Sequence, residues 1–107
     1  MSIGKTVKDI LIPLGAPVSR SNYNDSEATY ITYFCYNEQG EEWAENVEIA
    51  TGYYVQVDVW SDTDYVPLVA QVQAAMIAAG FIRTTAQDLY EPDTKTYHKA
   101  LRFSYIN

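Results

Sequence analysis

The chain has 107 residues, of which 48% are apolar and 20% charged, and its formal net charge is -7 at pH 7. This composition is typical of a globular protein and excludes a disordered or fibrous chain, and the length suits one domain spanning residues 1–107. Between residues 21 and 82 there are ten carboxylates and no lysine or arginine, so this part of the surface repels nucleic acid phosphates and anionic lipid headgroups.

The first half of the chain begins with a helix pattern and continues with aromatic strands. Ser2 can cap a helix over residues 3–12, which Pro13 and Gly15 end, and the polar residues 19–28 predict a loop. Residues 30–36 (YITYFCY) are aromatic and β-branched, which predicts a strand, and residues 37–40 (NEQG) predict a turn. The acidic segment 41–52 then forms either a loop or a short strand around residues 47–50.

The second half supplies the clearest elements. Residues 53–60 alternate valine with larger side chains and predict a strand, and residues 64–79 carry an apolar stripe at helical spacing. Residues 86–90 and 96–106 predict two strands joined by a turn. The sequence therefore predicts an α+β fold: an antiparallel-rich β-sheet, with the N-terminal helix and the second helix (about 64–79) packed on one face, and a C-terminal β-hairpin.

Single residues limit the chemistry of the chain. Cys35 is the only cysteine, so it cannot form a disulfide within the chain, and we expect it to pack as a small apolar side chain. His98 is the only histidine, and we expect it on the surface of a strand. No combination of nucleophile, base or metal ligands stands out. We therefore expect that the protein is not an enzyme and that it binds no metal and no cofactor. No signal peptide pattern is found at the N-terminus, which favours the cytoplasm.

Three aspartates stand close together around the end of the central strand. The spacing of Asp58, Asp62 and Asp64 resembles that of a calcium loop, but the turn glycine and the distal glutamate are missing. We expect Asp62 and Asp64 to cap the following helix, where carboxylates face the positive end of the dipole. Asp58 lies in mid-strand beside Tyr54 and Trp60, and we interpret this face as exposed or covered by another subunit.

Two further segments predict contacts with a partner. Trp43 stands among Glu41, Glu42 and Glu45, an arrangement typical either of a solvated loop with its tryptophan folded onto the sheet or of a docking segment. Residues 65–82 carry no charge, although a helix that faces solvent normally does. Proline, glutamine and glycine within this stretch argue against a membrane span. A partner surface explains it better, and the candidate residues are Trp43, Glu41, Glu42, Glu45, Tyr54, Asp58, Trp60, Val66, Ala70 and Ile77.

The order of these segments resembles a known family, the small tail completion proteins of long-tailed bacteriophages and prophages, which are related in fold to tail terminators. The resemblance covers residues 16–103 and rests on patterns of strand and helix, not on catalytic signatures. Its parts are APV at 16–18, YITYF at 30–34, YVQVDVW at 54–60, a helix of the form Tyr65-x-x-Leu68-Val69-x-x-Val72, and the hairpin from DLY at 88–90 to YHKALRF at 97–103.

The resemblance implies a structural, non-enzymatic role in virion assembly. Such proteins typically form a hexameric ring that caps the head-proximal end of the tail tube and joins the tail to the head connector. The implied partners are further copies of the chain, the major tail tube protein and the head–tail connector protein. DNA would pass without specific binding, and no membrane is involved. The implied location is the virion tail, assembled in the cytoplasm of the bacterial host.

Two other functions fit parts of the sequence. An acidic inhibitor or DNA mimic would use its carboxylates to bind the basic groove of a partner, and the charge asymmetry permits this. It would act as a monomer or dimer, and it would not need an uncharged helix. A small enzyme of the ferredoxin-like type is the other alternative, but it lacks an evident nucleophile, base or metal set.

Overall fold

The protein is described by a computed structural model that covers residues 2–23, 27–44, 47–92 and 96–106, the side chains of Glu41, Glu42 and Ile49 excepted. The described residues form two α-helices, a 3-10 helix and one five-stranded sheet. In chain order the elements are α1 (Ile3–Leu11), η1 (Ile12–Leu14), β1 (Val18–Arg20), β2 (Tyr30–Ala44), β3 (Val47–Ser61), α2 (Val66–Ala78), β4 (Ile82–Glu91) and β5 (Thr96–Ile106).

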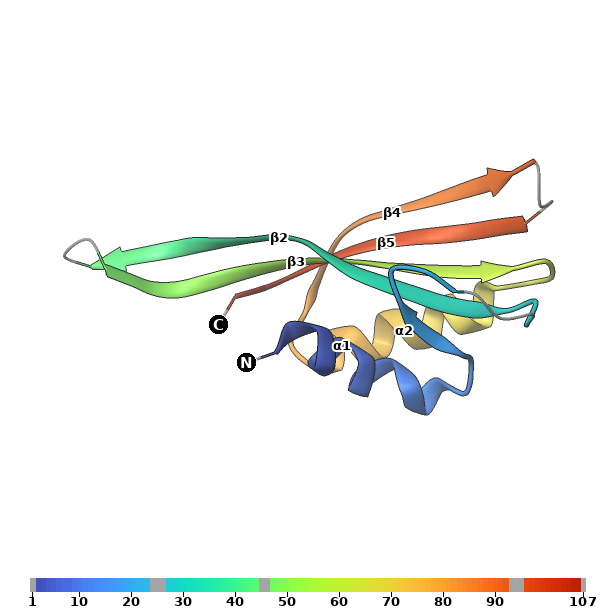
Figure 1. Ribbon diagram of the computed structural model, residues 1–107, viewed down its shortest axis with the longest axis horizontal. Coiled ribbons are helices and arrows are strands. Elements are labelled where there is room, and N and C mark those ends of the chain that lie inside the picture. The colour runs from blue at the N-terminus through green and yellow to red at the C-terminus, as the bar shows by residue number, and fades with distance from the viewer. Residues whose placement is uncertain (1, 24–26, 45–46, 93–95, 107) are drawn as a thin grey trace.

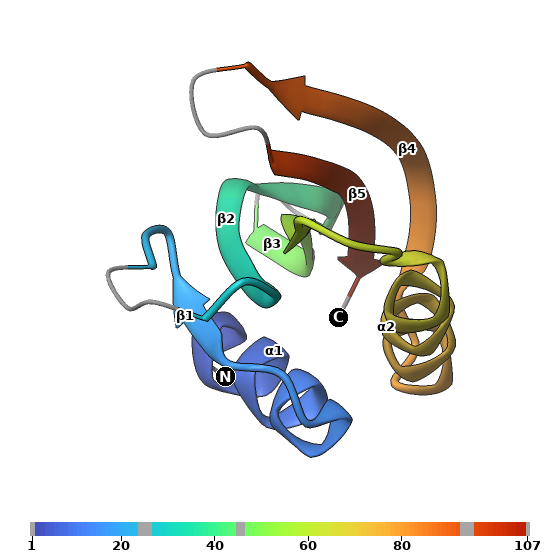
Figure 2. The ribbon, with the colours of Figure 1, turned by 90° about the vertical axis from the view of Figure 1, so that its right-hand side faces the viewer.

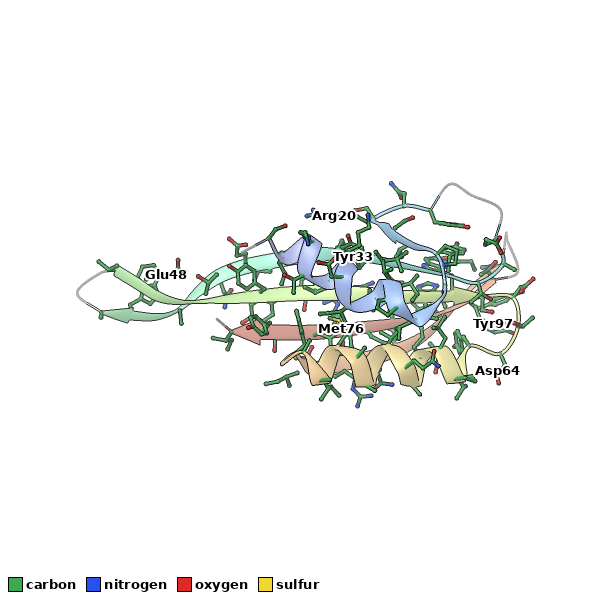
Figure 3. The ribbon with its side chains drawn as sticks, turned by 90° about the horizontal axis from the view of Figure 1, so that it is seen from below. Arg20, Tyr33, Glu48, Asp64, Met76 and Tyr97 are labelled. Carbon is green, nitrogen blue, oxygen red and sulfur yellow. The ribbon has the colours of Figure 1, made fainter. Side chains whose placement is uncertain are left out.

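The strands lie in the order β1-β2-β3-β5-β4, and all neighbours are antiparallel except β1 and β2, which are parallel. Both helices lie side by side against one face of this sheet (Figure 1, Figure 3). The prediction of an α+β fold with an antiparallel-rich sheet, an N-terminal helix, a second helix and a C-terminal hairpin is therefore confirmed.

The alternation of side chains along β3 separates the core from the opposite face. Val55, Val57 and Val59 point toward the helices and are at most 1% exposed. They pack in one cluster with apolar residues of both helices and of the neighbouring strands, because successive side chains of a strand point to opposite faces of the sheet. The cluster also contains Ile3, Val7, Leu11, Ile31, Tyr33, Val69, Val72, Met76, Phe81, Leu101 and Phe103.

Local sequence sets the ends of both helices. The Ser2 hydroxyl accepts a hydrogen bond from the Lys5 amide at 3.3 Å and caps α1. Pro67 lies in the first turn of α2, where its missing N–H leaves no internal hydrogen bond unmade. Gly80 follows α2 with a φ of 98°, a left-handed conformation that favours glycine and that ends the helix.

The hairpin of β2 and β3 extends beyond the rest of the molecule (Figure 1). The described part of β5 stops pairing with β3 at the Gly52↔Ile106 pair, so, among the described residues, 40–44 and 47–51 are paired only with each other. We call these two segments the arm. Each segment has five residues, which extend about 17 Å at the usual rise of a strand. The whole molecule measures 52 × 27 × 22 Å along its principal axes.

The other end of the sheet is strongly curved. Figure 2 shows β4 rising from the end of α2 and arching toward the side of the sheet that faces away from the helices. In the described part of the chain, β4 is the last strand in the order and pairs only with β5, so one row of its backbone groups has no strand partner there. All ten of its residues are exposed.

Some of the predicted boundaries were wrong. No turn lies at residues 37–40, because β2 continues to Ala44, and two of the register shifts of the hairpin fall between Cys35 and Asn37 and between Gly40 and Glu42. Turn-forming residues thus lie at β-bulges rather than at a chain reversal. The acidic segment is mostly strand, the predicted loop at 19–28 overlaps the last two residues of β1, and β4 begins at Ile82 rather than at residue 86.

Candidate assembly surfaces

The face of the sheet opposite the helices carries a buried polar network centred on Asp58. Asp58 is 5% exposed, and both of its carboxylate oxygens accept hydrogen bonds from the Gln56 amide nitrogen, at 3.0 and 3.1 Å. Arg102 Nε donates in turn to the Gln56 side-chain oxygen at 3.1 Å. Burial raises the pKa of Asp58 above its usual value, while the Gln56 hydrogen bond and the charges of His98 and Arg102 lower it by less.

His98 lies on the same face, and its prediction as a surface residue was wrong. The residue is 6% exposed, and its ring stacks on Trp60 with the centroids 3.9 Å apart. Its Nε2 lies 3.8 Å from Asp58 Oδ1, too far for a hydrogen bond, and its Nδ1 has no partner among the described residues. The β3–β5 register places His98 opposite Trp60 and diagonal to Asp58, an adjacency that only strand pairing reveals.

Stacked aromatic rings extend this network. Trp60 donates from Nε1 to the Thr32 hydroxyl at 3.0 Å, and its other neighbours are Tyr30, at a centroid distance of 5.7 Å, and His98. Tyr23 stacks on Tyr30 at 4.1 Å. The prediction that this face is exposed or covered by another subunit was therefore wrong for Asp58 itself, because residues of β3 and β5 in the same chain cover its side chain. Both Asp58 and His98 have side chains only 7% exposed.

The arm carries the predicted docking residue Trp43, which is 62% exposed. A Cβ added to Gly40 would come within 2.5 Å of the Trp43 ring and 2.6 Å of the Glu48 carboxylate, so the missing side chain at position 40 is what gives both groups their room. Val47 is also 62% exposed. The candidate side chains of Glu41, Glu42 and Glu45 lie outside the described part of the structure.

The outer face of α2 carries three of the other predicted interface residues. Val66 is 64% exposed and Ile77 is 54% exposed, and Ala70, between them on the helix, is exposed as well. Ile82 at the start of β4 continues this apolar surface at 66% exposure. Single exposed apolar side chains are common on protein surfaces, but a continuous uncharged helix face is typical of an interaction surface.

A groove of about 460 Å³ lies between α2 and the sheet edge formed by β4 and β5. Its apolar wall comes from α2, and its polar wall from the strands; the lining residues are Tyr65, Val66, Val69, Ala70, Gln73, Arg83, Asp88 and Lys99.

Hydrogen bonds across the groove join helix and strands. Asp88 accepts hydrogen bonds from the Tyr65 hydroxyl at 2.5 Å and from Lys99 Nζ at 3.1 Å, and these two bonds lower the pKa of Asp88. Burial and the Asp88 carboxylate raise the pKa of Tyr65 to about 12. Arg83 donates to the Gln73 side-chain oxygen at 2.8 Å.

The aspartates that precede α2 lie at its N-terminal end (Figure 3). Asp64 Oδ1 accepts a hydrogen bond from the Val66 amide at 3.0 Å, and Tyr65 occupies the capping position itself. Asp62 is exposed. Within the described residues, no group of three acidic, histidine or cysteine side chains could hold a metal ion, and no helix is long and apolar enough to cross a membrane.

The structure thus distributes the predicted interface residues over three places. Trp43 lies on the arm; Val66, Ala70 and Ile77 lie on α2; Tyr54, Asp58 and Trp60 lie on the sheet face away from the helices. Sequence reasoning missed the groove, because its two walls come from α2 and from strands that follow it in the chain. It also missed Arg83 and Lys99, whose position beside α2 depends on the curvature of the sheet.

Comparison with known proteins identifies the family. None of the curated proteins compared with this chain matches it. A chain in the structure of the virion of a native gene transfer agent (GTA) particle has the same fold, with a TM-score of 0.59 at 14% sequence identity, over 92% of this chain and 88% of that one. The family model described as tail completion protein gp17 matches residues 3–106. Because that match covers nearly the whole chain, the protein belongs to the tail completion protein gp17 family and is a structural protein of the phage tail.

Proposed function

We propose that the protein closes the head-proximal end of the tail tube as a homomeric ring, most simply a hexamer, and joins the tail to the head connector. The proposal rests on one observation: the same chain has two uncovered surfaces. These are the uncharged outer face of α2 and the open edge of β4. Surfaces of this kind are typical of subunit contacts. Family membership supplies the place of action, the phage tail.

A ring explains how one small protein can end a polymer. Head-to-tail contacts either close into a ring or continue as an open helix. A closed ring that binds one end of the tail tube, and offers no matching surface for further tube subunits, would stop growth at that point. Its other side would then be free to contact the connector.

The charge of the chain suits a channel through which DNA passes. The net charge of -7 repels phosphates, so the ring would not hold the genome by nonspecific binding. The family is one of structural proteins, and the burial of the Asp58–His98 pair is consistent with that role.

Tube assembly with purified proteins tests the proposal. Major tail tube protein should polymerise into tubes whose mean length falls as the protein is added, and electron microscopy should show extra density at one end only. Tails assembled without the protein should be overlong or fail to join heads. Tube lengths that do not change, together with normal joining in its absence, would contradict the proposal. An acidic inhibitor would instead stay monomeric or dimeric and bind a nucleic-acid enzyme.

A further inference from the structure

The arm and the groove between α2 and β4 complement each other, although no contact between them is possible within one chain. We propose that the described outer end of the arm of one copy (Trp43, Ala44, Val47 and Glu48), here called the arm tip, docks in the groove of the next copy, with Trp43 against the apolar wall and the acidic arm facing Arg83. This inference rests on the proposed self-assembly and specifies its contact.

The arm has the properties of a segment that is covered in the assembly. It is a two-stranded ribbon, which is marginally stable in water unless something packs against it. Its two large described apolar side chains, Trp43 and Val47, are each 62% exposed, although the small Ala50 is only 9% exposed, and the helices lie under the other end of the hairpin (Figure 1). An exposed tryptophan beside carboxylates is typical of the residues that contribute most to a protein interface.

The groove has the size and the lining to take an aromatic side chain. Its volume of about 460 Å³ lies within the roughly 300–1,000 Å³ of pockets that bind small molecules, so it has room for one indole ring. Val66, Val69 and Ala70 form its apolar wall. Val66 and Ala70 are exposed in the isolated chain, so an inserted ring would cover surface that the chain leaves in water.

The charges favour the arm as the occupant. The hairpin between residues 38 and 48 has five glutamates and no basic residue. Arg83, on the strand wall of the groove, donates to the uncharged Gln73 side chain, and within the described residues no carboxylate lies within 4.0 Å of it. A guanidinium without a counter-ion beside an apolar wall fits an incoming segment that carries both a tryptophan and carboxylates.

The geometry requires two copies. The arm tip and the groove are at separate parts of the molecule, since the arm projects past the helices (Figure 1, Figure 3), while the groove is lined by residues of α2, β4 and β5. The arm extends about 17 Å, and the molecule is 22–27 Å across its shorter axes, so the tip can reach well onto a neighbour. Such a contact joins two different surfaces and can be repeated around a closed ring.

Photo-crosslinking locates the arm tip directly. Trp43 is replaced by the photoreactive aromatic residue benzoylphenylalanine, which keeps a large ring at this position, and isotopically heavy and light copies are mixed to identify links between chains. Concentrated free protein and assembled tails are both irradiated, and the linked peptides are mapped by mass spectrometry. We expect heavy–light links from position 43 to residues 65–73 or 83–99. Links to any other part of a second copy would overturn the docking site while leaving ring formation intact.

Charge reversal provides an independent measurement. Arg83→Glu should weaken self-association at least tenfold in sedimentation or light scattering, whereas Lys8→Glu on α1, with the same change of net charge, should alter it less than twofold. Adding Glu48→Lys to the Arg83→Glu variant should restore part of the loss. Equal effects of the two single variants would overturn the proposed contact. If neither free protein nor tails showed any self-association or links, both this contact and the ring would be wrong.

Discussion

The hairpin of β2 and β3 has two halves that follow the same strand pairing but differ in what covers them. Near the helices, Val55, Val57 and Val59 are almost fully buried and the opposite face is covered by stacked rings and a hydrogen-bonded carboxylate. In the arm, Trp43 and Val47 are exposed. The inner half therefore stabilises the monomer, and the outer half, where the chain leaves the large side chains Trp43 and Val47 in water, is available to a partner.

Two matched valine substitutions test this contrast, and they should give the largest change in the free energy of unfolding. Val57→Ala removes two buried methyl groups, each worth about 0.8 kcal/mol, and leaves a cavity, so it should lower the free energy of unfolding by about 2 kcal/mol. Val47→Ala, at an exposed position of the same strand, should change it by less than about 0.5 kcal/mol. Urea denaturation of both variants measures their free energies of unfolding. Equal losses of unfolding free energy in the two variants would show that the arm is part of the core.

The buried carboxylate makes the inner half sensitive to pH. Because burial raises the pKa of Asp58 in the folded state above the ordinary value of 3.8, Asp58 contributes stability below about pH 3.8 that is lost as the pH rises through the raised pKa. In the Asp58→Asn variant, the amide side chain at position 58 does not titrate. The stability of the variant relative to the natural protein should therefore increase from pH 3 to pH 6. A flat difference in unfolding free energy over this range would contradict the burial account.

Gly40 tests the arm with a smaller effect. Gly40→Ala places a Cβ 2.5 Å from the Trp43 ring and must displace that side chain. We expect a change in unfolding free energy of at most about 1 kcal/mol, because the arm adds little to the core. Quenching of tryptophan fluorescence by acrylamide should change. Gly15→Ala strains a left-handed backbone (φ 91°) far from the arm, but its new Cβ meets no atom within 4 Å, so it should leave the quenching unaltered. Identical quenching in both variants would place the ring elsewhere.

The smallest expected effect concerns the groove. Tyr65→Phe removes the hydrogen bond to Asp88, a largely exposed carboxylate, and should lower the free energy of unfolding by at most about 1 kcal/mol. Spectrophotometric titration should lose one tyrosine that ionises near pH 12, since the pKa of Tyr65 is raised to about 12. Loss of a tyrosine that ionises near pH 10 instead would show that the hydrogen bond does not form in solution.

Local patterns predicted the elements that local physics controls. The alternation in residues 53–60 and the helical stripe from Leu68 to Ala79 depend only on the spacing of apolar side chains, and both segments have the predicted structure. The turn predicted at residues 37–40 was wrong, because glycine and asparagine are as well suited to a bulge as to a chain reversal. Only pairing with β3 distinguishes the two.

The sequence by itself determined the fold class, the acidic charge and the uncharged helix that indicates a partner, because composition and periodicity are properties of the chain alone. The tertiary structure decided which strands are neighbours, and therefore that Asp58 lies beside His98 and that Arg83 lies across a groove from Ala70. It also decided that the hairpin extends beyond the core. These features join residues far apart in the sequence, and they follow from the register and curvature of the sheet, which no local pattern specifies.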